Sequence, residues 1–242
     1  MYKRQVTLYS DDRDAGDGVR FPGRVRQTLG GHPVLDLQVG EVQVNPVLTI
    51  TVPDAARNPG ENVTSEEVAP GVWFLAGGSH NSVAIEMADH VIVVEAPLND
   101  ARTRAVFERV TQLAPGKPIR TVVNSHAHFD HAGGVRAAVS QGAAIVTGVA
   151  NVAFFERVLA QGNTLRPDAL AGAAGRTPTL RGVGEKLDIG DASRPVEVHA
   201  ITGGNHAQGL VMVWLPRERL LIEADAYTPL PANATPCLLY TS

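Results

Sequence analysis

The sequence predicts an α/β domain that follows a shorter antiparallel β segment. From residue 68 onwards, apolar runs typical of strands alternate with segments of helical periodicity, which is the pattern of a mixed α/β domain. Before residue 53, apolar and polar residues alternate, as in strands with one face towards solvent. Residues 53–67 are polar and rich in turn formers. We therefore expect a partial β domain over residues 1–52, a linker over 53–67 and the α/β domain over 68–242.

In the first segment, period-two alternation predicts strands at residues 35–39 and 42–44. Gly30 and Gly31 separate two strand-like runs, as the turn of a hairpin does. The acidic stretch at residues 10–18 (SDDRDAGDG) does not fit a calcium-binding EF-hand, because Gly16 falls where an oxygen ligand is required and no glutamate closes the loop. We expect a solvated hairpin turn at this stretch.

In the α/β domain, short apolar runs predict strands and helical spacing predicts the helices between them. Residues 91–94 (VIVV) are continuously apolar, which is typical of a strand buried on both faces. Asn99 and Asp100 cap a helix that we expect to run to about Leu113. The other expected helices are 134–140 and 152–160, and the other expected strands are 72–75, 82–85, 119–124, 143–146, 187–189, 196–201, 210–215 and 220–222.

Composition excludes several classes of protein. A hydrophobic fraction of 44% with a net charge of −4 is unlike a disordered chain, and it indicates no broad basic surface for nucleic acid. No apolar stretch approaches the roughly 20 residues that span a bilayer. The single cysteine, Cys237, excludes an internal disulfide framework. We expect a soluble protein that acts on a small molecule, without nucleic acid or a membrane span, and its oligomeric state stays open.

The two ends of the chain, residues 1–5 (MYKRQ) and 237–242 (CLLYTS), do not match its body. Their codons can be written as an inverted repeat, and they resemble a translated transposon-type sequencing adapter. We expect them to be foreign tips on a gene fragment, to be set aside as a fusion scar would be. Cys237 would then not be native, and the lack of a signal peptide would say nothing about the compartment.

The residues that carry chemistry gather in positions 124–134 (NSHAHFDHAGG). His126 and His128 stand two apart after a predicted strand, so their side chains project to the same side of an extended backbone. Asp130 and His131 follow where the chain turns into a helix, and they face a second position nearby. Imidazoles and a carboxylate are ligands that zinc prefers. The stretch therefore predicts a zinc site.

Two later residues extend this pattern. His206 lies in a glycine-rich turn (GGNH) between two predicted strands, and Asp225 follows the apolar strand at 220–222. The order His-x-His-x-Asp-His, then a histidine in a glycine-rich turn, then an aspartate after a strand, resembles the metallo-β-lactamase superfamily over about residues 68–236. The resemblance implies an αββα sandwich with two metal sites at one edge, here incomplete at the C-terminus.

By matching position, the resemblance divides six residues between two zinc ions. The first ion would be bound by His126, His128 and His206, the second by Asp130 and His131, and both by Asp225. The superfamily supplies one more histidine to the second ion, beyond the bridging aspartate. No histidine follows His206 in this sequence, so we expect the second zinc site to be incomplete here.

Two further residues are candidates for supporting roles. Glu95 follows the strand at 91–94, where the superfamily usually has an aspartate that supports the site, and its role is either support of a ligand or purely structural. His80, in the loop GSHN, either lines the pocket or has no part in the site. We expect the remaining histidines, His32, His90 and His199, to be structural.

These features predict a zinc-dependent hydrolase in which a metal-bound hydroxide attacks a carbonyl, ester or thioester-type substrate. Asp130 would orient the nucleophile or carry a proton. Two alternatives stay open. One is a mononuclear iron enzyme that resembles the persulfide dioxygenases, with His126, His206 and Asp225 as ligands. The other is a non-catalytic binding module of the cell envelope.

The first fifty residues carry a weaker resemblance. The pieces YSDDRDAGDGVRFPGRVRQ and GGHPVLDLQV are similar to the final hairpins of a lipoprotein-carrier-type β domain of bacterial envelope proteins. This similarity favours a periplasmic or secreted bacterial protein, and a cytoplasmic one stays open.

Overall fold

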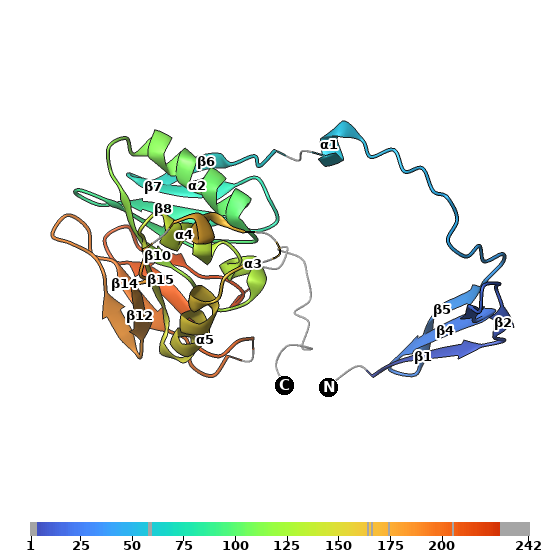
Figure 1. Ribbon diagram of the computed structural model, residues 1–242. Helices are drawn as coiled ribbons and strands as arrows, with labels where there is room; N and C mark the ends of the chain where they lie inside the picture. Colours follow the sequence, from blue (N-terminus) through green and yellow to red (C-terminus); the bar gives the residue numbers. More distant parts are fainter. Residues whose placement is uncertain are drawn as a thin grey trace. The chain divides into compact units, whose positions relative to one another are not determined.

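The computed structural model describes residues 4–57, 60–163, 165, 167–173, 175–204 and 206–227. These residues belong to two compact units, one within residues 4–57 and one within 60–227 (Figure 1). Cys237 and the C-terminal tip expected to be foreign lie outside the described residues, as do residues 1–3. None of the helices in the described part of the chain is long and apolar enough to cross a membrane.

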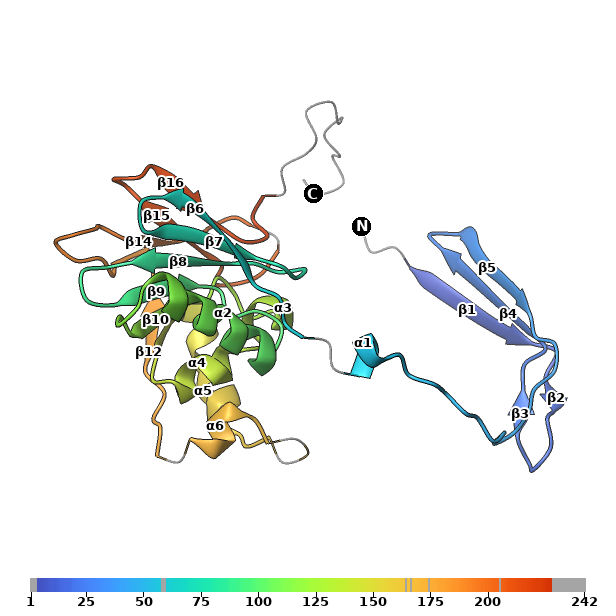
Figure 2. The same cartoon turned by 90° about the horizontal axis from the view of Figure 1, so that it is seen from above.

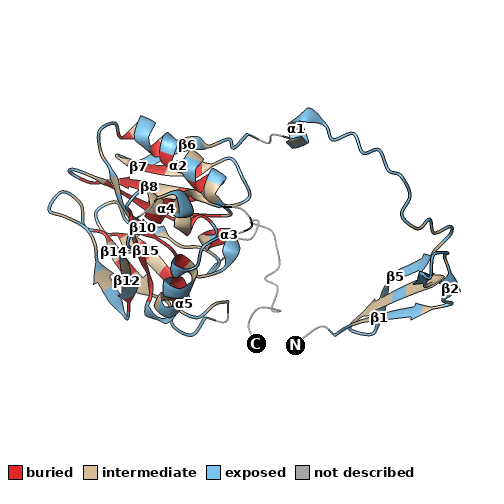
Figure 3. Cartoon of the chain, viewed as in Figure 1, coloured by how far each residue is buried: buried red, intermediate tan, exposed pale blue. Residues whose placement is uncertain are grey.

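The first unit is a three-stranded antiparallel sheet in the order β1-β4-β5. Its strands are β1 (Gln5–Ser10), β4 (Arg24–Leu29) and β5 (His32–Gln38), and a small hairpin of β2 (Arg13–Asp14) and β3 (Arg20–Phe21) spans the acidic stretch. Gly30 and Gly31 form the tight turn between β4 and β5, with φ of 58° and 85°, a conformation that favours glycine. No side chain described in residues 4–57 is buried (Figure 3).

Two segments near the boundary differ from the expectation. The strand predicted at residues 42–44 is wrong, since residues 39–53 form no regular element. Alternation alone does not make a strand when no neighbouring strand completes the hydrogen-bond ladder, and none among the described residues pairs with this segment. In the segment expected to be a linker, Asp54–Arg57 forms the short helix α1 and Thr64–Ala69 forms strand β6, which pairs with β7 (Val72–Ala76).

The second unit contains a seven-stranded mixed sheet in the order β12-β11-β10-β9-β8-β7-β6. After β6 and β7 its strands are β8 (Ser82–Glu86), β9 (Val91–Val94), β10 (Ile119–Val123), β11 (Ala144–Gly148) and β12 (Leu180–Val183). Strands β6 to β9 pair antiparallel, and β9 to β12 pair parallel. The parallel strands are joined through α2 (Asp100–Leu113), α3 (Phe129–Ala132), α4 (Val135–Ser140), α5 (Val149–Ala160) and α6 (Ala169–Gly172).

A second, antiparallel sheet covers the other face. Its strands are β13 (Lys186–Asp188), β14 (Glu197–Ala200), β15 (Val211–Leu215) and β16 (Leu220–Ile222), in that order. Figure 2 shows helices α2, α4 and α5 on one side of the seven-stranded sheet and β14–β16 on its other side. The described residues therefore form a helix–sheet–sheet arrangement, and the expected mixed α/β fold of the superfamily is confirmed.

Strand β9 explains how one sheet supports two cores. Val91 and Val93 face the core under the helices, whereas Ile92 and Val94 face the core between the two sheets. Because successive side chains of a strand point to opposite faces, a strand covered on both sides must be apolar throughout. The run VIVV therefore predicted this strand correctly. The cap of α2 is also as predicted, since the Asn99 side chain accepts a hydrogen bond from the Arg102 amide.

An arginine holds the loop after α5 against α4. The Arg136 guanidinium pairs with the Asp168 carboxylate, and both side chains are about nine-tenths buried, with exposures of 11% and 10%. Arg136 Nη1 also donates to the carbonyl oxygens of Val158 (2.8 Å) and Gln161 (2.7 Å). The hydrogen bond from Arg136 is the main cause that lowers the pKa of Asp168.

We expect Asp168→Ala to reduce the free energy of unfolding by about 3 kcal/mol at neutral pH, because it leaves a buried guanidinium unpaired. The pKa of Asp168 is lower in the folded state than in the unfolded state. The carboxylate therefore stabilises the folded state fully above the unfolded pKa of about 3.9, and this stabilisation is lost as the pH falls through the folded-state pKa. Urea denaturation of both proteins between pH 3 and 7 measures this difference.

Asp188→Ala is the matched control, since that carboxylate also pairs with a cation, Lys186, but is 74% exposed. We expect a change within about 0.5 kcal/mol for this control. Equal losses in the two variants would contradict a special role for the buried pair.

Candidate metal centre

The candidate residues meet at one edge of the second unit. Parallel strands β9 and β10 end at the same edge of the large sheet, and Glu95 and residues 124–131 follow them directly. His80 lies in the loop between β7 and β8 of the same sheet, whereas His206 and Asp225 follow β14 and β16 of the small sheet. The centre is therefore built where the two sheets meet.

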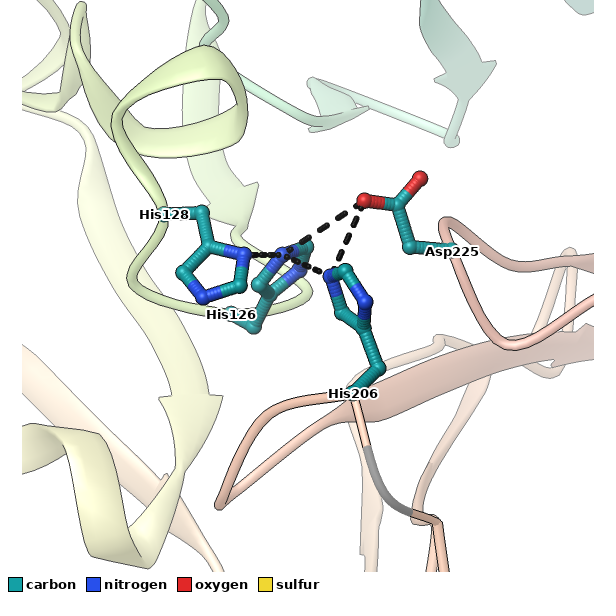
Figure 4. Close-up of side chains that lie close together, drawn as sticks. All are labelled: His126, His128, His206 and Asp225. Carbon is teal, nitrogen blue, oxygen red and sulfur yellow. Dashed lines mark hydrogen bonds and ion pairs between the residues drawn. The ribbon is translucent and has the colours of Figure 1, made fainter. Parts of the chain in front are cut away.

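The first group of donors contains His126, His128, His206 and Asp225 (Figure 4). The Nε2 atom of His126 lies 3.0 Å from Nδ1 of His128 and 3.2 Å from Nε2 of His206. Oδ2 of Asp225 lies 3.1 Å from Nε2 of His206 and 3.8 Å from Nε2 of His126. Two ligand atoms on one tetrahedral zinc ion, each bound at 2.0–2.1 Å, lie about 3.3–3.4 Å apart. The spacing of this group is close to that value, so its donors fit a zinc-sized ion.

His126 is held with one nitrogen facing the group. Its side chain is fully buried, and the Ser125 hydroxyl lies 2.9 Å from its Nδ1, which leaves Nε2 towards the other donors. Burial, together with the charges of the neighbouring His131 and His128, lowers the pKa of His126 to about 4. The imidazole is therefore neutral at pH 7, the form that binds metals.

The second group contains His80, Asp130 and His131. Oδ2 of Asp130 lies 3.1 Å from Nε2 of His80 and 3.9 Å from Nε2 of His131. The same His131 nitrogen lies 3.1 Å from Oδ2 of Asp225. Asp225 therefore presents one oxygen to both groups, from a backbone in the left-handed region (φ 63°). The predicted residues thus come together in two adjoining groups, with Asp225 between them.

The side chain of Glu95 contacts two residues of the motif, Ser125 and His131. Its carboxylate is buried. The Oε2 atom lies 2.7 Å from Nδ1 of His131, and Oε1 accepts a hydrogen bond of 2.6 Å from the Ser125 amide. Burial alone would lower the pKa of His131, but the hydrogen bond and charge of Glu95 and the charge of Asp225 raise it. The backbone of Glu95 is left-handed, with φ of 73°, an uncommon conformation for this residue type. Of the two roles considered for Glu95, the geometry favours support of a ligand.

Asp130 carries a negative charge at neutral pH. Burial acts to raise its pKa, but a hydrogen bond from its own amide and the charges of His131 and His80 outweigh that effect and lower it. Its side chain is 28% exposed, so it faces both the donors and the solvent.

The two glycines that follow the motif allow close packing behind it. A Cβ atom on Gly133 would lie 2.1 Å from the Leu98 carbonyl oxygen, and one on Gly134 would lie 1.9 Å from the Thr103 hydroxyl. Any larger residue would push the loop out of place.

A third group of possible donors contains Asp89 and His90, in the turn between β8 and β9, and Asp191, which follows β13. Its carboxylates already have other partners, since Asp89 pairs with Arg120 at 2.8 Å and Asp191 accepts bonds from the Ser193 and Arg194 amides. Hydrogen bonds and ion pairs of the turns account for these carboxylates, and a structural role for His90 stays a prediction.

A cavity of about 540 Å³ adjoins the centre. Apolar side chains of both sheets form most of its wall, for example Val94, Val123 and Val213. His80, Glu95, His131 and Asp225 also line it. His80, His131 and Asp225 are therefore accessible from a largely apolar chamber.

Some contacts at the centre carry no signal in the sequence. The hydroxyls of Ser79 and Ser125 each precede the histidine that they contact, and serine is too common in loops for this pattern to be noticed. Asn124 donates to the His131 carbonyl oxygen (3.0 Å), and the fully buried Arg102 donates towards the His80 carbonyl oxygen (3.4 Å). Arg102 is different, because it lies four residues before Val106 on the buried face of α2, and this helical spacing is a signal that could have found it.

The chain is similar to two curated relatives. It is 27% identical over 183 residues to the 2,4-dinitroanisole O-demethylase subunit alpha of Nocardioides sp. (strain JS1661), which covers 75% of this chain and 52% of that protein. It is 25% identical over 181 residues to the alkyl/aryl-sulfatase BDS1 of Saccharomyces cerevisiae (strain ATCC 204508 / S288c), which covers 61% of this chain and 28% of that protein. The chain thus spans about half of one relative and just over a quarter of the other.

Solved structures show the same fold. A metallo-beta-lactamase from Pontibacter korlensis aligns with a TM-score of 0.52 at 15% identity, covering 66% of this chain and 70% of that one. The DIM-1 metallo-beta-lactamase aligns with a TM-score of 0.50 at 18% identity, covering 66% and 67%. In sequence, residues 75–229 match the family described as the metallo-beta-lactamase superfamily. With this match over most of its length, and with its histidine-rich candidate metal centre at the meeting edge of two sheets, the chain belongs to the metallo-beta-lactamase superfamily.

Proposed function

We propose that the protein is a zinc-dependent hydrolase that cleaves a small-molecule substrate at a carbonyl, ester or thioester-type carbon. The observation that carries the proposal is the convergence of two donor groups on one shared oxygen, Oδ2 of Asp225. Nitrogen and oxygen donors in this number and spacing suit zinc. We assign His126, His128 and His206 to the first ion, Asp130 and His131 to the second, and Asp225 to both.

Each donor would have a defined task in this reaction. When bound, a zinc pair lowers the pKa of water towards neutrality and stabilises negative charge on a reacting oxygen. The neutral imidazole of His126 would donate a lone pair without having to lose a proton. Asp130 presents Oδ2 to the histidines, which leaves its Oδ1 to orient the attacking water and accept its proton.

The names of the relatives suggest which substrates to try. One relative is named for removing a methyl group from 2,4-dinitroanisole, and the other for alkyl and aryl sulfates. A largely apolar cavity beside the donors is compatible with a substrate that carries an alkyl or aryl group. We therefore propose a test panel of an aryl methyl ether and an aryl sulfate in addition to a lactam, a lactone, a thioester and a phosphodiester.

We expect His128→Ala to lose bound metal and hydrolysis together, with a loss of at least ~100-fold in kcat/KM on whichever substrate the protein accepts. The reason is that His128 faces His126 at 3.0 Å and contributes to the first group. Metal content after dialysis and turnover on the panel are measured on the same samples. His199→Ala is the control, since His199 pairs with Glu197 in β14, away from the donor groups.

Undiminished hydrolysis by the metal-free protein would contradict the proposal of a zinc-dependent hydrolase. Two zinc ions per chain support it, whereas one iron per chain with oxygen consumption would favour the mononuclear alternative at His126, His206 and Asp225.

We expect Glu95→Gln to weaken zinc binding by about 10- to 100-fold, because the neutral amide no longer fixes the orientation and charge of His131. Glutamine keeps the size of the side chain and an oxygen that accepts from the Ser125 amide. Competition with a chromophoric chelator measures the affinity. Glu197→Gln removes a similar carboxylate–histidine contact (2.8 Å) in β14 and serves as the control. Equal affinities in the two variants would show that Glu95 has only a structural role.

A further inference from the structure

We propose that His80 binds the second metal ion through its Nε2 atom and completes a site with Asp130, His131 and the shared Asp225. The inference rests on the proposed function and adds a ligand to it. The motif at residues 124–134 does not contain this residue, because His80 comes from the loop between β7 and β8, well before the motif in the chain.

The geometry of His80 is that of a ligand. Its Nε2 lies 3.1 Å from Oδ2 of Asp130, and its ring lies edge-on to the ring of His131 with centroids 5.1 Å apart. One donor atom from each of these three residues lies within 4.8 Å of the others. Oδ2 of Asp225 lies 3.1 Å from the same His131 nitrogen, so two nitrogens and two oxygens are available to the second ion. Four such donors are the usual number for zinc in proteins.

The ring of His80 is oriented in the same way as the rings of His126 and His131. Ser79 Oγ lies 2.9 Å from its Nδ1, as Ser125 Oγ lies 2.9 Å from Nδ1 of His126. In His131 the partner of Nδ1 is Glu95. In all three residues, therefore, a neighbouring oxygen occupies Nδ1 and leaves Nε2 for the centre, which is the usual arrangement of metal-binding histidines.

The backbone beneath His80 is held by a buried charge. The Arg102 side chain is fully buried and donates from Nη2 to the His80 carbonyl oxygen (3.4 Å) and from Nη1 to the Asn62 carbonyl oxygen (2.8 Å). Burial of a guanidinium costs free energy. A buried guanidinium that bonds to the carbonyl oxygen of His80 therefore indicates that it fixes the position of this loop. Arg102 is a positioning residue for His80.

The histidine content of the chain agrees with this assignment. All eight histidines lie among the described residues, and five of them, His80, His126, His128, His131 and His206, belong to the two donor groups. The second group would otherwise contain one imidazole and the first group three. With His80 assigned, the second ion has two imidazoles and its own carboxylate.

The competing explanation is that His80 only donates a hydrogen bond to Asp130. Two substitutions separate these roles. His80→Gln keeps an N–H donor for Asp130 but is a poor zinc ligand, so only ligation predicts a loss. His80→Asp offers a carboxylate ligand but repels Asp130, so ligation predicts partial recovery and a simple hydrogen bond predicts further loss.

The experiment is a titration of the metal-free protein with Co²⁺, followed by its visible absorption and by isothermal calorimetry, without substrate. We expect two binding steps in the unsubstituted protein. In His80→Gln the second step should weaken at least tenfold while the first stays within threefold, and His80→Asp should recover part of the second step. His199→Gln should match the unsubstituted protein. Circular dichroism of the metal-free variants checks that each is folded.

A second step that stays within threefold in His80→Gln would overturn the assignment. So would a single step in the unsubstituted protein, because no second site would then exist. If the unsubstituted protein takes up no metal at all, the proposed function itself fails. Two tight binding steps whose affinities do not change when His80 is substituted would refute only this inference.

Discussion

The donor nitrogens of the centre lie close together in spite of the mutual repulsion of their lone pairs. His126 Nε2 faces nitrogen atoms of both His128 and His206, at 3.0 and 3.2 Å. A neutral imidazole has one unprotonated nitrogen, and two such nitrogens repel each other unless a proton or a cation lies between them. One proton satisfies one pair, whereas a cation satisfies all three rings and Asp225 together. The surrounding fold must therefore hold together donors that would separate if they were free.

Three features of the fold supply that restraint. The parallel strands β9 and β10 end together, which fixes Glu95 and the motif side by side. The buried Glu95 carboxylate joins the Ser125 amide to the His131 ring, so that the two ends of the motif share one support. The Val211 amide, in the small sheet, donates to the Ser125 carbonyl oxygen at 3.0 Å and connects the sheets beside the donors. Rigid elements of this kind position a site more accurately than loops alone.

Local patterns were sufficient for the parts of the structure that depend on local interactions. The run at residues 91–94 and the Asn99 cap predicted β9 and α2, because burial on two faces and capping leave a mark within a few residues. The prediction of a strand at residues 42–44 was wrong, because a strand forms only beside a partner strand, and the alternation of apolar and polar residues does not show whether one is present. The motif indicated the cluster of six donors, but His80 could not be found in this way. Its approach to Asp130 depends on the β7–β8 loop and on the buried Arg102, which are tertiary features.

The position of the donors on both sheets has a consequence for the lifetime of the protein. His126 and His128 follow a strand of the large sheet, whereas His206 and Asp225 follow strands of the small one, and the two layers pack mainly through aliphatic side chains. A bound ion would therefore tie the layers together, and at 1,000 times its dissociation constant it would add about 4.1 kcal/mol to the free energy of unfolding. Loss of the ion would then expose the chain to proteolysis, so the supply of the metal would govern how much of the protein survives.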